Sequence, residues 1–172
     1  MAIEKPEYVV ELSSNGIEVR QYSEYWIAEC HVSGVSDLSA AGSRAFGRLF
    51  GYISGENSEG RKIAMTSPVQ QIPSDSGWDV SFVVPKDVSI GTIPVPSNST
   101  ISIRKVEAGR FAVLQYSGTW SEEKFRAKTS LLLKAVSDLK LKPISSVSSA
   151  FYNPPFTPPF LRRNEVMVRL EA

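Results

Sequence analysis

Two stretches of the sequence, 84 residues apart, can be laid over each other without a gap. IEVRQYSEYWIAECHVSG (residues 17–34) aligns with ISIRKVEAGRFAVLQYSG (residues 101–118), and five positions are identical. The same offset places Phe82 opposite Val166. Similarity at a constant offset predicts two similar structural units. We therefore expect a single domain over residues 1–172 with an internal repeat, about 12–85 and 97–171.

The two halves have the same predicted order of elements. Alternating apolar and polar residues predict strands, at 17–22, 25–33, 62–72, 78–84, 100–106, 110–117, 146–152 and 164–170. Helical patterns cover 37–54 and 121–139, with Asp37 or Ser39 as the first N-cap. Helices beside mainly antiparallel strands give an α+β fold. The sequence thus predicts a distorted antiparallel β-barrel or curved sheet with two helices, built from two pseudo-symmetric βαββ-like halves.

Charge and hydropathy argue against several classes of partner. The net charge is +1 and the pI is about 7.8, whereas nucleic-acid binders usually show a strong basic excess or a basic stripe. No apolar run approaches the ~18 residues of a membrane span. The opening MAIEKPEYVVEL lacks the apolar core of a signal peptide. We expect a complete cytoplasmic protein with neither a nucleic-acid nor a membrane partner.

The chain contains one cysteine, Cys30, and one histidine, His31. A single cysteine excludes an intramolecular disulfide, and zinc sites draw on several Cys or His ligands. Adjacent residues of a strand point to opposite faces, so a Cys–His dyad between these two is excluded. We expect Cys30 in the core and His31 on the surface. No catalytic triad, metal cluster or phosphate loop is visible, and no metal site is predicted.

The first predicted helix contains AAGSRAFGRLFGYIS (residues 40–54). Glycine inside a helix costs about 1 kcal/mol relative to alanine, so Gly47 and Gly51 suggest that something approaches this helix closely. Either the helix packs tightly on the sheet or on another subunit, or it forms a shelf for a flat ligand. In the second case Phe46 and Phe50 would contact the apolar face of that ligand. The helix alone leaves both interpretations open.

Two motifs together indicate a family. KIAMTSPV (residues 62–69) and YNPPFTPPFLRRNEV (residues 152–166) resemble signatures of the SOUL haem-binding protein family. The opening YVVELSSNGIEVRQY and the helix end FGYISGEN match as well, so the resemblance runs from about residue 6 to residue 171. It implies a fold similar to gyrase-inhibitor-type effector-binding domains. It also implies that haem or another tetrapyrrole lies in an apolar cleft between the first helix and the proline-rich loop.

The resemblance places family positions on particular residues. Some members carry a basic residue, thought to face one propionate, at the position of Ser43, and Arg44 is its neighbour. The lysine thought to serve the other propionate corresponds to Thr157 or Pro158. Gln21 stands where some members are proposed to have a histidine ligand, so we expect haem to bind without strong axial ligation. The candidate ligand-binding residues are Ser43, Arg44, Phe46, Gly47, Phe50, Thr157, Pro158, Phe160 and Arg162.

Four prolines stiffen the loop of the second motif, because proline fixes φ and lowers the entropy lost on ordering. At the 84-residue offset the first half has only VQQIPSDSGW (residues 69–78). We therefore expect the loop to form a preformed wall of the cleft, with Phe156 and Phe160 as its apolar surface. At most one of Arg162 and Arg163 is expected to face the cleft, while the other, or Glu165, holds the loop to the protein.

These features support four functions to different degrees. The first is non-catalytic binding of haem or a related tetrapyrrole, as carrier, buffer or sensor, oriented by arginine–propionate bonds. The second is a binding module for another planar or amphipathic small molecule. An enzyme acting on such a molecule is the third, and a pocket that holds a buried glutamate with a shifted pKa would favour it. A partner-binding protein with a large exposed apolar patch is the fourth.

Overall fold

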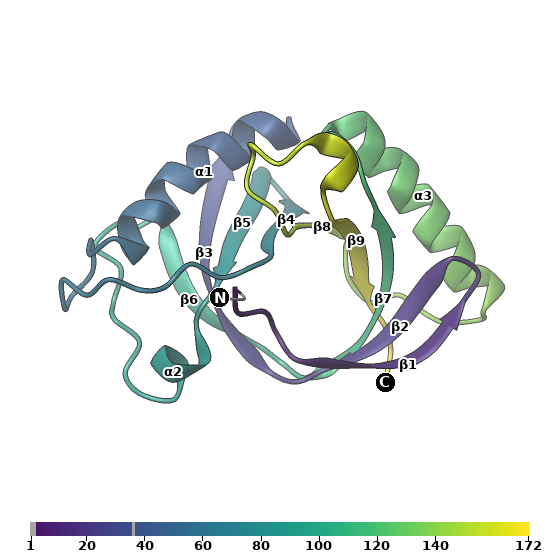
Figure 1. Ribbon diagram of the computed structural model, residues 1–172, viewed down its shortest axis with the longest axis horizontal. Helices are drawn as coiled ribbons and strands as arrows, with labels where there is room; N and C mark the ends of the chain where they lie inside the picture. Colours follow the sequence, from purple (N-terminus) through teal and green to yellow (C-terminus); the bar gives the residue numbers. More distant parts are fainter. Residues whose placement is uncertain (1–2, 36) are drawn as a thin grey trace.

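Nine strands form one continuous antiparallel sheet in the order β1-β2-β7-β9-β8-β4-β5-β3-β6, and the sheet curls into a half-barrel (Figure 1). The computed structural model describes residues 3–35 and 37–172. The strands are β1 (Tyr8–Ser14), β2 (Ile17–Tyr22), β3 (Tyr25–Ser33), β4 (Val69–Ser74), β5 (Gly77–Val83), β6 (Ile101–Val106), β7 (Gly109–Tyr116), β8 (Ser148–Phe151) and β9 (Asn164–Arg169). The helices are α1 (Leu38–Ile53), α2 (Lys86–Ser89), α3 (Glu122–Asp138) and the 3₁₀ turn η1 (Pro159–Leu161). The predicted α+β fold with a curved antiparallel sheet is confirmed.

The two halves are pseudo-symmetric in strand order and in register. Without β1, the strands lie in the order β2-β7-β9-β8-β4-β5-β3-β6. If each strand is replaced by its counterpart in the other half (β2 by β6, β3 by β7, β4 by β8 and β5 by β9, and the reverse), the same order results, read from the opposite edge. The first strand of each half pairs with the second strand of the other half. Ala28 lies opposite Ile103 on β6, and Ala112 lies opposite Val19 on β2. Ala28 and Ala112 are 84 residues apart, and so are Val19 and Ile103. This is the same offset that aligns the sequence.

Both long helices lie outside the curve of the sheet (Figure 1). Asp37 caps α1 by accepting a hydrogen bond from the Ala40 amide at 3.0 Å, and Ser121 caps α3 in the same way through the Lys124 amide at 3.2 Å. The apolar side of α1 packs on β3 and β5, and that of α3 on β7 and β9. No helix in residues 3–35 and 37–172 has the length and apolar character needed to cross a bilayer.

The structure corrects the prediction in three places. The expected strand at 62–72 begins only at Val69, because the backbone before it bonds to separate segments: the Ile63 amide to the helix end and the Ser67 amide to the Glu4 carbonyl. The edge strand β1 was not predicted, and its apolar residues Val9, Val10 and Leu12 are all exposed. The linker between the halves contains the short helix α2.

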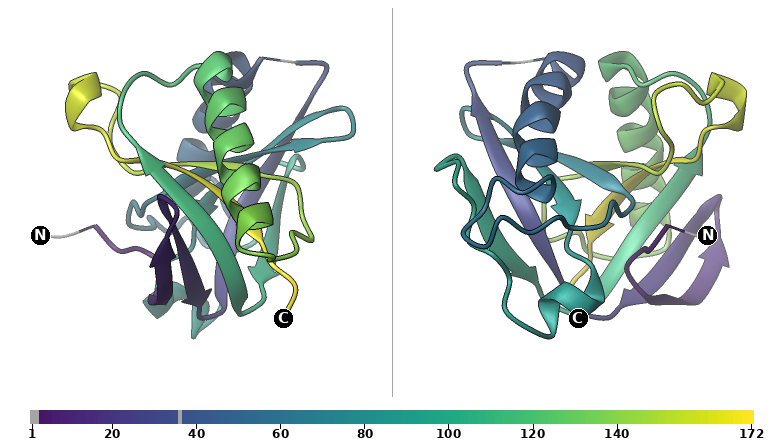
Figure 2. Two further views of the ribbon diagram at one scale, coloured as in Figure 1. Left: turned by 90° about the vertical axis from the view of Figure 1, so that its right-hand side faces the viewer. Right: turned by 60° about the vertical axis from the view of Figure 1, so that its left-hand side comes forward.

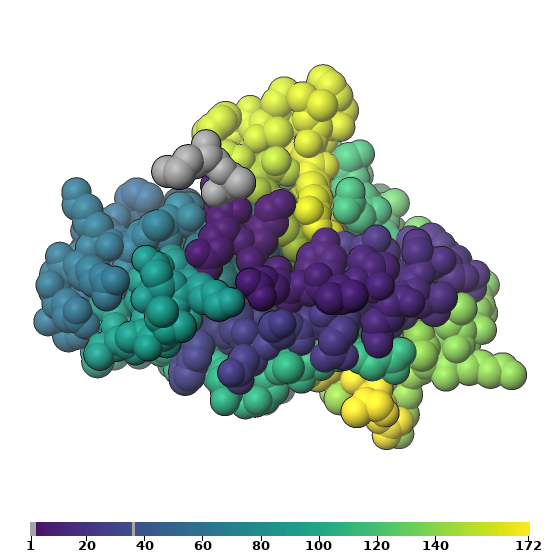
Figure 3. Space-filling model, turned by 60° about the horizontal axis from the view of Figure 1, so that its bottom comes forward, coloured from purple at the N-terminus to yellow at the C-terminus, as the bar shows by residue number. Residues whose placement is uncertain are grey.

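The halves differ most in one connection. Asp75 and Ser76 alone join β4 to β5, whereas residues 152–163 join β8 to β9. We call this longer segment the arch. It projects from the body of the protein between α1 and α3 (Figures 1 and 2). The N-terminal segment, Ile3 to Glu7, runs over the surface beside the arch (Figure 3), and Glu4 forms a bridge with Thr66.

Candidate functional site

A cavity of about 650 Å³ lies between α1, the segment before β4 and the first part of the arch. Phe46 and Phe50, one turn apart on α1, contribute two stacked rings whose centroids are 6.0 Å apart with an interplanar angle of 14°. The lining residues are Ile3, Leu38, Ser39, Gly42, Ser43, Phe46, Phe50, Met65, Thr66, Ser67, Val69, Gln71, Trp120, Phe151, Tyr152, Asn153, Pro154, Pro155 and Phe156. This volume and this apolar character are typical of small-molecule sites.

Among the described residues, no charged side chain, histidine or cysteine lines this cavity. The lining therefore suits an apolar ligand better than a metal ion. Met65 offers a thioether, which is a soft ligand. The phenol of Tyr152 instead donates a hydrogen bond to Glu165 Oε1 at 3.0 Å. Within residues 3–35 and 37–172, no group of three His, Cys, Asp or Glu residues is placed to hold a metal ion.

The structure separates the predicted site residues into two groups. Ser43, Phe46 and Phe50 line the cavity. The others do not: Arg44 and Gly47 on α1, and Thr157, Pro158, Phe160 and Arg162 in the second half of the arch. Phe160 is 76% exposed. The sequence did not single out Gly42, Met65, Trp120 or Tyr152 as cavity residues. Met65 and Tyr152 nevertheless lie within the two family motifs.

The glycines of α1 differ in what surrounds them. A Cβ added at Gly47 would meet nothing within 4 Å, so of the alternatives left open by the sequence, close packing on the sheet does not apply at that position. At Gly51 a Cβ would collide with the Glu56 carboxylate, and at Gly42 it would lie 3.0 Å from Gln71 Oε1. Gly42 is therefore the α1 glycine at which the helix approaches the sheet beside the cavity.

Arg162 holds the arch in shape. Its guanidinium donates to the carbonyls of Thr157 at 2.8 Å and Pro155 at 2.7 Å, and it lies 4.4 Å from the centre of the Trp120 ring. The Gly118 amide donates to the Pro159 carbonyl at 2.9 Å. These bonds satisfy carbonyls of a loop that, because of its prolines, has few amides to pair with them. Arg162 thus stabilises the cavity wall from outside.

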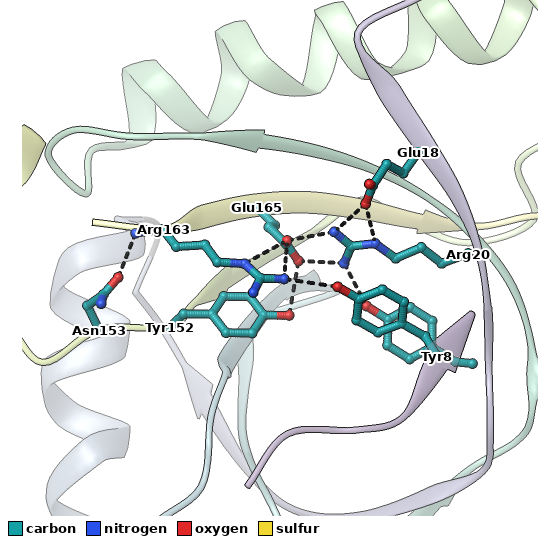
Figure 4. Close-up of polar contacts among 8 residues, drawn as sticks. Tyr8, Glu18, Arg20, Tyr152, Asn153, Arg163 and Glu165 are labelled. Atoms are coloured by element: carbon teal, nitrogen blue, oxygen red, sulfur yellow. Dashed lines mark hydrogen bonds and ion pairs between the residues drawn. The ribbon is translucent and has the colours of Figure 1, made fainter. Parts of the chain in front are cut away.

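A buried ionic network fixes the base of the arch (Figure 4). Arg20 on β2 donates to both oxygens of Glu165, at 3.0 and 2.9 Å, and Arg163 donates to Glu165 Oε2 at 3.1 and 2.9 Å. Arg20 is 2% exposed and Glu165 is fully buried. Tyr152 donates to the same carboxylate. Because Tyr152 also lines the cavity, this network connects the cavity wall to the sheet.

The network sets the protonation of its members. Burial alone would raise the pKa of Glu165, but the hydrogen bonds and charge of Arg20, together with Arg163, lower that pKa below its usual value. Burial, followed by the Glu165 charge, raises the pKa of Tyr152, so its hydroxyl remains a donor. A carboxylate with a lowered pKa, bonded through both oxygens, is a poor general base near neutral pH.

We expect acid to destabilise the protein through Glu165. Its folded pKa lies below its unfolded value, so its contribution to stability is complete above about pH 4.3, the ordinary pKa of glutamate, and is lost as the pH falls through the folded pKa. Urea unfolding midpoints measured from pH 7 to pH 3 should therefore fall less steeply for Glu165→Gln than for the wild type. Parallel declines would show that other carboxylates carry the acid sensitivity.

The sequence matches one known protein family. The sequence pattern of the family described as SOUL heme-binding protein matches residues 3–169, nearly the whole chain. No curated protein matches the sequence significantly.

Solved structures share the fold at low identity. The C-terminal domain of EcmrR is similar at a TM-score of 0.67 and 12% identity, over 90% of this chain and 96% of that one. A hydrolase from Listeria innocua is similar at 0.57 and 9%, over 94% of each chain. SAV2435, solved bound to tetraphenylphosphonium, is similar at 0.51 and 8%, over 91% of this chain and 94% of that one. At these identities the likeness concerns the fold alone.

Proposed function

Because this chain belongs to the SOUL haem-binding protein family, we propose that it binds haem or a related tetrapyrrole without catalysis, as a cytoplasmic carrier, buffer or sensor. The proposed site is the cavity between α1 and the arch. The observation that carries this proposal is the apolar lining, which includes the stacked rings of Phe46 and Phe50 and the prolines Pro154 and Pro155 of the arch. Burying the faces of a porphyrin there would supply affinity without iron coordination.

The proposal assigns separate roles to the cavity and to its rim. Phe46, Phe50 and Phe156 would contact the macrocycle. Arg44 is exposed on α1 beside Ser43 and is the cation nearest in sequence to the lining residues of that helix. It would reach a propionate at the cavity mouth, where a charge-assisted bond orients the ligand. With no histidine or cysteine in the described lining, metal-free protoporphyrin and haem should bind with similar affinity.

A matched pair of variants tests the site. Phe50→Ala should weaken protoporphyrin binding roughly 10- to 100-fold, because it removes about 1.5–3 kcal/mol of apolar contact. Phe160→Ala removes the same side chain from the outer side of the arch and should leave the Kd within about threefold, well under the tenfold that 1.4 kcal/mol represents. Absorbance titration at the Soret band measures both. Equal losses in the two variants, or none in either, would contradict binding in this cavity.

A second ligand class follows from the neutral lining. A planar or amphipathic molecule without carboxylates would fit a cavity that has no cation in its described wall. Binding of tetraphenylphosphonium by SAV2435 makes such molecules reasonable probes. A thermal-shift screen of porphyrins, bile pigments and planar drugs distinguishes the two classes. Stabilisation by non-tetrapyrroles only would replace the tetrapyrrole with this second class.

A further inference from the structure

The sole histidine of the chain lies between a carboxylate and a hydroxyl. His31 Nδ1 is 2.7 Å from Asp79 Oδ1, and His31 Nε2 is 3.1 Å from Ser76 Oγ. Both distances are within the reach expected between a nucleophile, its base and the group that orients the base. We propose that Ser76, His31 and Asp79 form a nucleophilic triad that accepts the acyl group of an ester. This site is separate from the cavity between α1 and the arch.

The hydrogen-bond pattern sets the roles of the three groups. An ionised carboxylate only accepts hydrogen bonds, so Asp79 requires the proton of the neutral imidazole to be on Nδ1. Nε2 then carries a lone pair and accepts from the Ser76 hydroxyl. That is the tautomer in which histidine acts as the general base toward serine. Ser74 Oγ also lies 3.4 Å from Nδ1, on the orienting side of the ring.

The fold holds these residues in place through backbone contacts. His31 and Asp79 are directly opposed in the β3–β5 register, so their side chains leave the same face of the sheet. Ser76 belongs to the two-residue turn between β4 and β5, and its carbonyl accepts from the Gly34 amide at 2.9 Å. Gly77 has no room for a side chain, since a Cβ there would collide with the Val32 carbonyl. The turn is thereby kept against the end of β3, with Ser76 beside His31.

A second hollow, of about 570 Å³, borders the turn. Ser76 is part of its wall, whereas His31 and Asp79 are not. Trp78 and Phe125 contribute apolar surface, and Arg126, Asp75 and Glu122 contribute charged groups. Such a hollow fits a small apolar acyl group. Arg126 is exposed and is paired with Glu122 at 3.2 Å. Asp75 and Glu122 also line the hollow and offset this cation, so a neutral acyl group is favoured.

The chemical step balances without a further reagent. Ser76 Oγ bonds to the carbonyl carbon of the ester while its proton passes to His31 Nε2. The ester C–O bond then breaks, and the alcohol leaves with that proton. Water repeats the sequence on the acyl-serine and releases the acid. Because His31 is 45% exposed, solvent reaches the site, so rapid turnover is expected only for activated esters.

Active-site labelling tests the triad directly. The full-length protein is treated with a fluorophosphonate, and the modified residue is located by tandem mass spectrometry. We expect one label, on Ser76, which is lost in Ser76→Ala. His31→Ala should slow labelling about 10²- to 10⁴-fold, the usual contribution of a general base. Ser102→Ala, an exposed serine on β6, is the matched control and should label at the wild-type rate.

Three results would overturn the proposal. They are the absence of labelling, a label that persists unchanged in His31→Ala, and a label on Ser74 instead of Ser76. Circular dichroism of each variant checks that the fold is retained. Release of p-nitrophenol from p-nitrophenyl acetate should fall in parallel with labelling across the variants. Phe50→Ala should change neither rate, which separates this site from the tetrapyrrole cavity.

Discussion

Glu165→Ala is expected to lower the free energy of unfolding by about 3–5 kcal/mol, the usual cost of removing one partner from a buried ion pair. Arg20 would keep only Glu18 and Tyr22 as polar side-chain partners, at 2.9 Å each, while 2% exposed. Arg163 and Tyr152 would lose the same acceptor. For a domain of this size each kcal/mol shifts Tm by about 2–4 °C, so thermal unfolding should show a drop of roughly 6–20 °C.

The sheet offers a matched control for this prediction. Arg104, at the 84-residue counterpart of Arg20, also forms a two-bond pair with a glutamate, Glu29, at 3.2 and 2.9 Å. That pair is exposed: Arg104 is 53% and Glu29 18% accessible. Glu29→Ala should therefore cost about 0–1 kcal/mol, as exposed pairs do. Similar losses in the two variants would mean that burial does not distinguish the pairs.

The fold could be predicted largely because its elements repeat. The alternation around Ala28 and Ala112, and the caps Asp37 and Ser121, are local signals that can be read along the chain. The register between β3 and β6 is not local and was not predicted, although its pairs repeat the 84-residue offset found in the sequence. The edge strand β1 was missed, and its apolar residues Val9, Val10 and Leu12 are exposed rather than part of the core.

The candidate site could be predicted only in part. Phe46 and Phe50 were found because they share a helix face and because a family motif names the opposite wall. The direction of the arch was not predictable, because it depends on the hydrogen bonds that Arg162 donates to the carbonyls of Pro155 and Thr157. Phe160 therefore faces solvent, although its position in the motif suggested the cavity.

Glu165 was expected to hold the loop to the protein, and it does so through Arg20, Arg163 and Tyr152. Its partners Arg20 and Tyr152 and the Ser76–His31–Asp79 cluster were not predicted, for one reason. The network and the cluster each join residues far apart in the chain, and the pairing follows from strand register. His31 was correctly placed on the surface as a single residue. Its relation to Asp79, 48 positions away, becomes visible only when β3 and β5 are paired.

The close contact at Gly77 leads to the second large effect. In Gly77→Ala the new methyl group would meet backbone atoms, including the Val32 carbonyl carbon at 2.9 Å and Ser33 Cα at 3.0 Å, and backbone cannot rotate away as a side chain does. The ends of β3 and β5 must separate, and we expect a loss of about 2–3 kcal/mol, toward the upper end for overpacking. Urea unfolding measures this loss.

Gly47→Ala is the matched substitution at a site where the added methyl meets nothing within 4 Å. It should raise stability by up to about 1 kcal/mol, because alanine is the better helix former. The same glycine-to-alanine change is thus expected to lower stability at position 77 and to raise it at position 47, because the surroundings of the two glycines differ. A Gly77→Ala protein as stable as the wild type would show that the turn is not held against β3.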